Sequence, residues 1–373
     1  MTPPTLPVSP SGPTPVVSVV IATYNRRPKL ERVLAHLLQQ TLPADQAEIL
    51  IVDNSSTDDT GAWVASLPPG RQPALRYFVK DPNGPGSARN FGARHSRGEF
   101  VVFLDSDVLL DSQWLARAVG QLRGDPSLGL LGGKLLYAFA PDRVNAFGGV
   151  TGWIGLSWDA HEGEPDRGLD RPRDCLWVNS SAMIARRELF LEVGGFDETF
   201  FYGYEEADLG WRINLAGSRV GCSPDLVAHH DVDPATGTSD RQVVYHYCKN
   251  RLRTLIRNSS PGRLLACLPA YALYSIADLA LRGPRGPKLA ALRWNLASLP
   301  DTLRLRAGTQ ARRRAAPGAV ERLISPRWFP AVPLNNQRRR PVPGFDAGAG
   351  AAGTGPGAAD DRVGSPPGPA TGA

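Results

Sequence analysis

The alternation of apolar runs with amphipathic segments between residues 16 and 105 is the feature that most constrains this chain. Residues 16–22 form one continuous apolar run, as a strand buried on both faces should. Further apolar runs and helical patterns then alternate: helix 28–38, strand 48–52, helix 56–67, strand 75–79, helix 87–96 and strand 100–104. Repeated strand–helix units with short connections predict an α/β fold with a mostly parallel, Rossmann-like sheet flanked by helices.

All four of these strands run into polar residues. The four ends are Thr23-Tyr24-Asn25, Asp53-Asn54-Ser55, Asp81-Pro82-Asn83-Gly84 and Asp105-Ser106-Asp107. In an open parallel sheet the carboxyl ends of the strands share one edge, so these side chains should converge. Asp and Asn also cap helices and start turns, and each end alone could be structural. Together they favour a nucleotide site, and the absence of GxxxxGK[ST] and of GxGxxG after the first strand excludes the P-loop and dinucleotide-binding classes.

Asp105 and Asp107 present two hard oxygen donors one residue apart. Such donors suit Mg²⁺ or Mn²⁺, which bridge protein carboxylates to the phosphates of a substrate. An acidic turn that only caps the following segment is the alternative. One imidazole of the pair His229 and His230 could complete the coordination, and adjacent histidines in a strand point to opposite faces, so at most one reaches the site.

A second acidic cluster follows the aromatic and glycine-rich residues 200–204. Glu205 and Asp208 should share one helix face, whereas Glu206 is turned by about 100° from Glu205, so the two glutamates cannot have the same role. An i,i+4 pair of Asp208 with Arg212 and a favourable helix dipole offer a purely structural reading. A carboxylate desolvated beside the aromatic residues would instead have a raised pKa and be a better base.

The positive charge of the chain is confined to its C-terminal part. Residues 251–340 carry 18 Lys and Arg against 3 Asp and Glu, whereas residues 1–250 carry 23 against 30, which argues against a nucleic-acid partner. The basic part also contains apolar runs, and this mixture favours an anionic membrane surface. The apolar stretch that includes residues 264–274 is shorter than the roughly 20 residues of a span. It is broken by Pro269 and, further on, by Asp278, so it should lie on the bilayer. Helices that pack on the main domain are the equal alternative.

The remaining composition suggests two tails and a reducing compartment. The proline-rich residues 1–15 and the Gly, Ala and Pro-rich residues 336–373 should be disordered, because they can bury little apolar surface. The four cysteines lack metal-binding or paired spacing, and the first residues lack the pattern of a signal peptide. We therefore expect a cytoplasmic protein, peripheral on the inner face of the cell membrane if the basic segment binds lipid.

Taken in order, these motifs resemble family 2 glycosyltransferases, and among them the rhamnosyltransferase-like branch. The residues that carry the resemblance are 19–26, 51–56, 86–92, 103–107, 195–198 and 205–209, and the similarity covers about residues 16–260. It implies a GT-A fold with a donor half at residues 16–134 and an acceptor and base half at 135–260, followed by a basic amphipathic helical extension at 261–335. It also implies metal-dependent inverting transfer from a nucleotide diphospho-sugar.

The resemblance assigns roles to particular residues. Thr23, Tyr24, Asn25 and Asp53 would hold the nucleoside of a UDP- or TDP-sugar, and Arg89 and Asn90 would lie near the donor. Asp105, Ser106 and Asp107 would engage Mn²⁺ or Mg²⁺ and the diphosphate, with His230 as a metal-side histidine because residues 224–230 match the spacing of the family pattern. Glu206 occupies the position of the catalytic base, and Glu205 is the alternative.

The acceptor is less constrained. Trp153 and Trp158 fall between the two halves and should shape an acceptor site together with Asp208, although ordinary core packing explains these tryptophans as well. A glycan or lipid-linked acceptor in polysaccharide biosynthesis of the cell envelope fits such a site. Two rival functions remain: a nucleotidyltransferase that makes sugar nucleotides, which should show a Gly-rich basic first loop, and a non-catalytic membrane-bound protein that binds sugar nucleotides.

Overall fold

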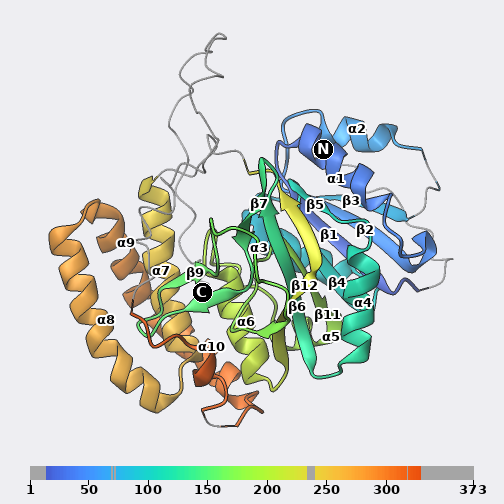
Figure 1. The fold of residues 1–373 in the computed structure, drawn as a ribbon. Coiled ribbons are helices and arrows are strands. Elements are labelled where there is room, and N and C mark those ends of the chain that lie inside the picture. Colours follow the sequence, from blue (N-terminus) through green and yellow to red (C-terminus); the bar gives the residue numbers. More distant parts are fainter. Residues whose placement is uncertain (1–13, 69, 71–72, 233–239, 317, 329–373) are drawn as a thin grey trace.

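The structure, a computed structural model, describes residues 14–68, 70, 73–232, 240–316 and 318–328 (Figure 1). The disorder predicted for residues 1–15 and 336–373 falls outside these ranges, except at residues 14 and 15.

The expected alternation is present in the first part of the chain. The elements are β1 (Val17–Thr23), α1 (Arg27–Leu37), the short 3₁₀ turn η1 (Ala44–Gln46), β2 (Ala47–Asp53), α2 (Thr60–Ser66), β3 (Ala74–Val79), α3 (Gly84–His95) and β4 (Phe100–Asp105). The strands lie within a residue or two of their expected positions. The second helix begins four residues later than expected, since Asn25 and Asp58 accept hydrogen bonds from the backbone of residues 57–60 and hold them in a loop.

The second part adds irregular strands and then helices. Its elements are β5 (Val108–Leu110), α4 (Trp114–Gly124), β6 (Leu128–Tyr137), β7 (Ala140–Ala146), β8 (Gly149–Thr151), β9 (Ser157–Asp159), β10 (Arg173–Asp174), β11 (Ala182–Arg186), α5 (Arg187–Glu192), α6 (Glu205–Leu215), β12 (Arg219–His230), α7 (Asp240–Asn258), α8 (Pro261–Leu281), α9 (Arg285–Ala297), α10 (Leu299–Ala311) and the 3₁₀ turn η2 (Glu321–Leu323).

One sheet organises the molecule, with strand order β10-β12-β6-β11-β4-β1-β2-β3. Strands β3, β2, β1 and β4 are mutually parallel, and β6 and β12 are parallel to each other. Strand β11 lies antiparallel between β4 and β6, and β5 and β7 add antiparallel edges. The predicted fold class is confirmed: a mostly parallel α/β sheet with helices on both faces.

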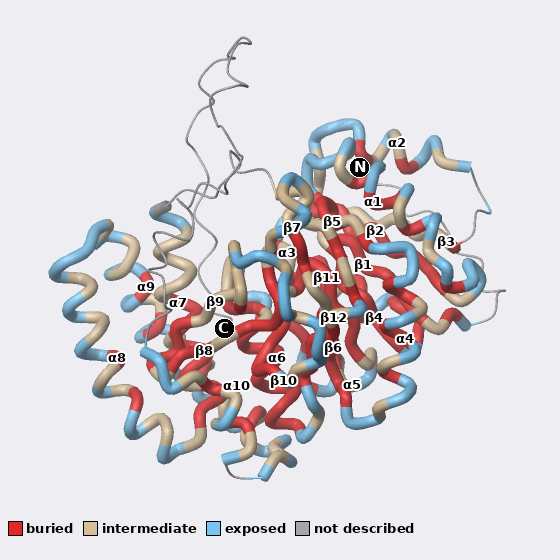
Figure 2. Tube along the Cα trace, viewed as in Figure 1, coloured by how far each residue is buried: buried red, intermediate tan, exposed pale blue. Residues whose placement is uncertain are grey.

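Side chains that alternate along the central strands form two cores, one on each face of the sheet. Val19 and Ile21 of β1 pack on the side of α1 and α4, whereas Val20 packs on the side of α3 and α5. Figure 2 shows these strands as the most continuously buried part of the chain. This rigid sheet fixes the position of every side chain at its carboxyl edge.

Helices α7–α10 form a separate layer beside α6, away from the sheet (Figure 1). A third apolar cluster joins them to the domain through Trp211 of α6, Leu255 of α7 and Tyr271 of α8. The packing alternative for the basic segment is therefore correct for α7 and for the inner faces of α8–α10. Arg253 and Arg257, which contributed to the apparent basic surface, lie buried inside this layer.

The expectation that Pro269 and Asp278 interrupt the apolar segment is wrong. Helix α8 is continuous over 21 residues, with Pro269 inside it. Pro269 lies on the exposed side, where solvent can reach the carbonyl that loses its hydrogen bond, and Lys288 pairs with Asp278 at 2.6 Å. Among the described residues, α8 alone is long and apolar enough to cross a membrane, which by length and composition alone is weak evidence.

Helix α6 is held to α7 by a buried ion cluster. Asp208 accepts hydrogen bonds from Arg212 at 2.8 Å, from Arg257 at 3.1 Å and from Asn258 at 2.8 Å, and it is fully buried. Asp197 joins the same cluster by accepting from Arg253 at 2.9 Å. The structure therefore does not bring Asp208 to an acceptor site, because both of its carboxylate oxygens are taken up in the interior.

We expect Asp208→Ala to destabilise the fold by about 3–5 kcal/mol, because it leaves two buried guanidinium groups without their carboxylate. Urea unfolding followed by circular dichroism measures this loss. The control is Asp174→Ala, which removes an exposed pair with Arg219 and should cost about 1 kcal/mol or less. Equal losses for the two variants would contradict the structural role of the cluster.

Candidate functional site

Asp105, Asp107 and His230 meet at the carboxyl edge of the sheet. Each offers one ligand atom, and these atoms all lie within 4.8 Å of one another. Asp105 ends β4, and His230 ends β12, where the backbone N–H of residue 231 donates to the carbonyl of Asp107 at 2.8 Å. The sequence-predicted trio is thus brought together by two strands that are far apart along the chain.

His230 is oriented by a partner that the sequence did not reveal. Its Nδ1 lies 2.9 Å from Oδ1 of Asn145, and its Nε2 lies 3.5 Å from Oδ1 of Asp107. The tautomer that donates from Nδ1 to Asn145 leaves the Nε2 lone pair facing the carboxylates, the arrangement expected of a metal-ligating histidine. His229 is directed elsewhere, near Asp111 and His36, and its pKa is lowered by burial.

This donor set fits a divalent ion. Two carboxylates and one neutral imidazole suit Mn²⁺ or Mg²⁺, and the group is near enough together for one ion to touch all three. Burial alone would raise the pKa of Asp107, but His230, Arg26 and Lys29 hold it below its ordinary value. Asp107 is therefore ionised at neutral pH, as a ligand must be.

Two arginines bring positive charge to the same edge. Arg26, which follows β1, donates to Oδ2 of Asp107, and Arg89 of α3 donates to Oδ1 of Asp105. Arg89 is buried, whereas the side chain of Arg26 is 44% exposed. Guanidinium groups beside a metal site are well suited to phosphate oxygens. The family resemblance implies a place near the donor for Arg89 but assigns no role to Arg26.

Two adjacent serines in the loop before β11 join the two acidic clusters. The Ser181 hydroxyl donates to Asp105 at 2.9 Å, and its carbonyl accepts from the Asp105 backbone at 2.9 Å. The Ser180 hydroxyl donates to Oε1 of Glu206 at 2.8 Å. The glutamate at the start of α6 and the aspartate at the end of β4 thus lie on either side of one dipeptide. No spacing pattern in the sequence pointed to these serines.

The two glutamates differ as the helical geometry requires. Glu205 is 5% exposed, and burial together with the neighbouring charge of Glu206 raises its pKa to about 8. Glu206 is half-buried and carries the hydrogen bond from Ser180. Tyr204, which precedes them, has a φ of 75° and donates to the carbonyl of Gly155 at 3.0 Å, so it ties the start of α6 to the β8–β9 hairpin.

The β8–β9 hairpin supplies a further carboxylate near Glu206. Burial raises the pKa of Asp159 to about 8, with contributions from Glu162 and Glu206, and Asn179 donates to Asp159 at 3.1 Å. Trp158 is the neighbour of Asp159 in β9, and because successive strand residues alternate in direction, its ring lies on the other side, beside Gly152. Trp153 instead stacks on Trp328 at a centroid distance of 5.2 Å, among the C-terminal residues.

The strand ends on the other side of the site contain polar atoms without partners. Oγ1 of Thr23 and Oδ1 of Asn54 are buried without a hydrogen-bond partner among the described residues, which indicates a place for a polar ligand. Tyr24 is 53% exposed. The oxygens of Asp53 accept from the Ser56 backbone and from the Tyr77 hydroxyl, and its role toward the nucleoside stays a prediction.

Three further residues of the predicted donor site, Asn25, Asn90 and Ser106, are hydrogen-bonded to, or buried among, other parts of the protein. Asn25 accepts from the backbone of Thr57 at 2.7 Å and so joins the loops after β1 and β2. Asn90 exchanges hydrogen bonds with the backbone of Phe196, at 2.9 Å in both directions, and so joins α3 to the segment before α6. Ser106 is buried between the two metal-side aspartates. Contact of these three with a donor remains a prediction.

Solved structures share this fold. A crystal structure of GalNAc-T7 with UDP, GalNAc and Mn²⁺ superposes with a TM-score of 0.55 at 16% identity, covering 77% of this chain and 58% of that one. The structure of residues 1–349 of TarS from S. aureus gives 0.51 at 17% identity, covering 83% of each chain. At such identities the likeness concerns the fold, which is GT-A.

Curated relatives align over a little more than half of this chain. O-antigen biosynthesis protein RfbC of Myxococcus xanthus is 33% identical over 58% of this chain and 17% of its own length. Glycosyltransferase AglE of Haloferax volcanii is 26% identical over 56% of this chain and 67% of its own length. Validoxylamine A glucosyltransferase of Streptomyces hygroscopicus subsp. jinggangensis is 31% identical over 54% and 52%. The chain thus spans between about a sixth and two thirds of the length of these relatives.

The family model described as glycosyl transferase family 2 matches residues 18–139, which include β1–β4, both metal-side aspartates and the two arginines. The rhamnosyltransferase-like branch stays a prediction. Fold, motif order and relatives agree with this match, so residues 18–139 resemble a glycosyl transferase family 2 domain.

Proposed function

We propose that this protein transfers a sugar, with inversion, from a nucleoside diphosphate sugar to a hydroxyl group of an acceptor. The observation that carries the proposal is the Ser180-Ser181 dipeptide, which holds Glu206 and Asp105 on its two sides. A candidate base and a candidate diphosphate site therefore adjoin one space, as a single displacement requires.

The donor would lie along the carboxyl edge of the sheet. Thr23, Tyr24 and Asp53 support binding of a uridine or thymidine moiety, and Arg26 and Arg89 support binding of its diphosphate. Asp105, Asp107 and His230 would hold Mn²⁺ or Mg²⁺, which when bound supplies positive charge to the departing diphosphate. The two arginines add to this positive charge at fixed positions.

Glu206 is the proposed base. It accepts the proton of the acceptor hydroxyl while the hydroxyl oxygen attacks the anomeric carbon from the face opposite the diphosphate, and the bond to the diphosphate breaks. The Ser180 hydrogen bond orients its carboxylate. Glu205 is a poorer candidate because its carboxyl is buried and is largely protonated below pH 8.

The acceptor would approach from the β8–β9 hairpin. Asp159 offers a carboxyl beside Glu206, which suits a sugar ring or another polyhydroxylated group, and the role of Trp158 toward the acceptor stays a prediction. A glycan or lipid-linked acceptor of cell-envelope polysaccharide synthesis is the proposed class.

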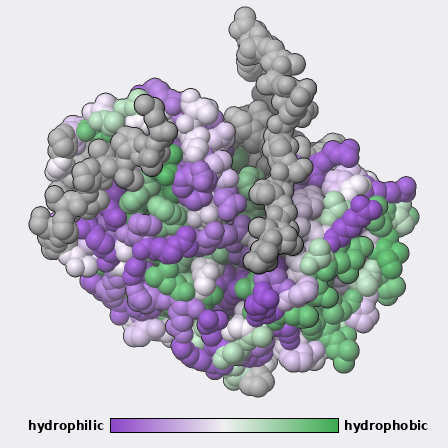
Figure 3. Space-filling model, turned by 180° about the vertical axis from the view of Figure 1, so that it is seen from behind, coloured by the Kyte–Doolittle hydropathy of each residue, from purple (hydrophilic) through white to green (hydrophobic). Residues whose placement is uncertain are grey.

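We also propose that α8 and α9 dock on an anionic membrane surface. Their exposed apolar side chains are Leu265, Leu273, Ile276, Leu281, Leu289, Leu292 and Leu296. Figure 3 shows apolar side chains gathered over this part of the molecule. The three acidic residues described from 261 onward, Asp278, Asp301 and Glu321, are each paired with a basic side chain, so the exposed Arg282, Arg285 and Arg293 leave this surface cationic.

Nucleotide binding should depend on the metal ligands. In a thermal-shift screen of UDP-, TDP- and GDP-sugars with Mn²⁺, we expect one class to stabilise the protein and Asp107→Asn to abolish this effect. Asn145→Ala, which only removes the partner of His230, should weaken the Mn²⁺-dependent binding by about 10–100-fold. Asp111→Asn changes an exposed carboxylate outside the cluster and is the control. Unchanged binding in Asp107→Asn would exclude the metal site.

Transfer should depend on Glu206 more than on Glu205. We expect Glu206→Gln to lower the rate of nucleoside diphosphate release to acceptor by about 10²–10⁴-fold while donor binding persists, since the amide keeps the size of the side chain but takes no proton. Glu205→Gln is the matched control and should retain most of the activity. A larger loss in Glu205→Gln would assign the base to Glu205, and full activity in both variants would exclude both glutamates as the base. Absence of transfer by the parent protein, with donor binding retained, would favour a binding protein.

Membrane docking should depend on the exposed face of α8. We expect the variant Leu265→Gln, Leu273→Gln, Ile276→Gln to lose most of its flotation with vesicles of phosphatidylcholine and phosphatidylglycerol, because these side chains are 80%, 71% and 66% exposed. Leu38→Gln, just after the distant first helix, is the control. Flotation that survives the triple change would exclude this surface.

A further inference from the structure

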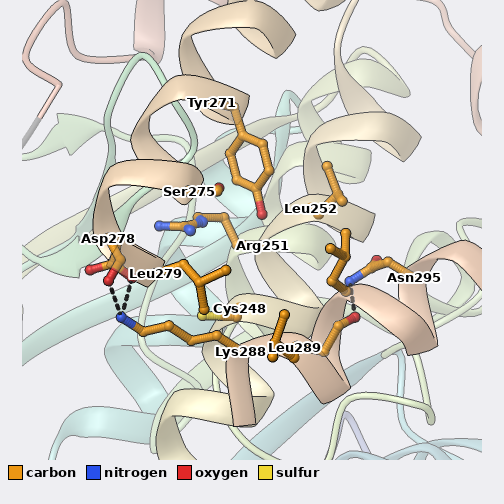
Figure 4. Close-up of a pocket in the computed structure, with 12 residues that line it drawn as sticks. Cys248, Arg251, Leu252, Tyr271, Ser275, Asp278, Leu279, Lys288, Leu289 and Asn295 are labelled. Atoms are coloured by element: carbon orange, nitrogen blue, oxygen red, sulfur yellow. Dashed lines mark hydrogen bonds and ion pairs between the residues drawn. The ribbon is translucent and has the colours of Figure 1, made fainter. Parts of the chain in front are cut away.

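The C-terminal helical layer contains a pocket distant from the elements that form the carboxyl edge of the sheet. It lies between α7, α8 and α9 and has a volume of about 500 Å³, its open mouth included (Figure 4). Apolar side chains form most of its wall, among them Leu252, Leu279, Leu289 and Leu292.

A buried arginine without an acidic partner faces this pocket. Arg251 is 5% exposed, and among the described residues no carboxylate lies within ion-pairing distance of it. Its guanidinium lies against the rings of Tyr271 and Tyr274, at 4.9 Å from each centroid. Aromatic faces offset only part of the desolvation of a buried cation, so the pocket holds an uncompensated positive charge.

The neighbours of Arg251 on α7 show that this lack of a partner is local. Arg253 and Arg257 both pair with Asp197, and Arg257 also pairs with Asp208. Arg251 is turned by about 200° from Arg253 around the helix and so faces the opposite side, toward α8. Helix α7 therefore has one side whose arginines are neutralised and another whose arginine is not.

A second donor in the pocket also lacks an acceptor. Oγ of Ser275 and Nε of Arg251 are both buried without hydrogen-bond partners among the described residues. Figure 4 shows Ser275 next to the guanidinium of Arg251, with Tyr271 beside them. The one carboxylate in the wall, Asp278, is already paired with Lys288 at 2.6 Å. A hydroxyl and a guanidinium without acceptors suit the oxygens of a phosphate group.

The pocket is continuous with the surface proposed to dock on the membrane. Leu289 and Leu292 line the pocket and are also 43% and 48% exposed, so its apolar wall extends into the exposed face of α9. A ligand that enters from a bilayer would meet leucine side chains first and the cationic Arg251 deeper in.

We propose that this pocket binds a phosphate-headed amphiphile, with the phosphate on Arg251 and Ser275 and an apolar chain along Leu279, Leu289 and Leu292. This inference deepens the proposed membrane docking and rests on it for the source of the ligand. It assigns the pocket to a lipid phosphate, and free phosphate is the alternative source of the same head-group chemistry.

The test measures binding of three soluble probes to the full chain by calorimetry. The probes are dihexanoyl phosphatidic acid below its critical micelle concentration, inorganic phosphate, and dihexanoylglycerol, which has the chains without the phosphate. We expect saturable binding of the phosphatidic acid, which Arg251→Gln weakens about tenfold or more, and no binding of the glycerol lipid. Equal affinity for inorganic phosphate would overturn the amphiphile, and unchanged binding in Arg251→Gln would overturn the site.

The stability of the ligand-free variant separates a binding role from a structural one. Arg251→Met removes an uncompensated charge, so its Tm without ligand should equal or exceed that of the parent protein. A lowered Tm would mean that Arg251 serves to pack α7 against α8 and would overturn the proposal. The triple variant of α8 should lose vesicle flotation and keep binding to the soluble phosphatidic acid, so failure of membrane docking and failure of the pocket are distinguishable.

Discussion

The fully buried Asp208 is the interaction on which the arrangement of this protein depends. It joins α6 to α7 through Arg257 and Asn258 and also pairs with Arg212 of its own helix, and α7 in turn supports α9 and α10. A buried carboxylate is tolerated only when its partners are complete, so the position of α6 is tightly defined. Since Glu205 and Glu206 begin α6, a charge cluster in the interior determines where the proposed base lies relative to the sheet edge.

The same constraint explains why two neighbouring glutamates behave differently. The turn of about 100° between successive residues of a helix directs Glu205 into the interior and Glu206 toward Ser180. Burial, together with the neighbouring charge of Glu206, raises the pKa of Glu205 to about 8. Position in the helix, rather than residue type, separates the proposed catalytic carboxylate from its neighbour.

The sequence predicts local and periodic features of this fold well. The four strands of the first half, the convergence of their ends, and the trio Asp105, Asp107 and His230 all follow from apolar runs and from the shared edge of a parallel sheet. Ser180, Ser181 and Asn145 do not, because their positions depend on β11 lying antiparallel between β4 and β6. The spacing of apolar residues does not show that β11 is inserted between β4 and β6. Single polar residues in loops belong to no repeating pattern from which their position could be predicted.

The number of charged residues in a segment also does not predict which of them lie on the surface. The excess of arginine after residue 250 suggests one cationic surface. In the structure, however, some of these arginines are buried and paired with carboxylates, whereas others are exposed to solvent. Arg253 and Arg257 are interior groups whose charge is neutralised by Asp197, Asp208 and Asp301, whereas Arg282, Arg285 and Arg293 are exposed.

Arg251 belongs neither to the buried, paired arginines nor to the exposed ones. It is buried like the first group and has no carboxylate partner, unlike that group. Since a protein interior disfavours an isolated charge, a chain that needed only packing at this position would be at least as stable with an apolar side chain there. The unpaired guanidinium is therefore best explained by an anion that enters the pocket and that the protein does not itself supply.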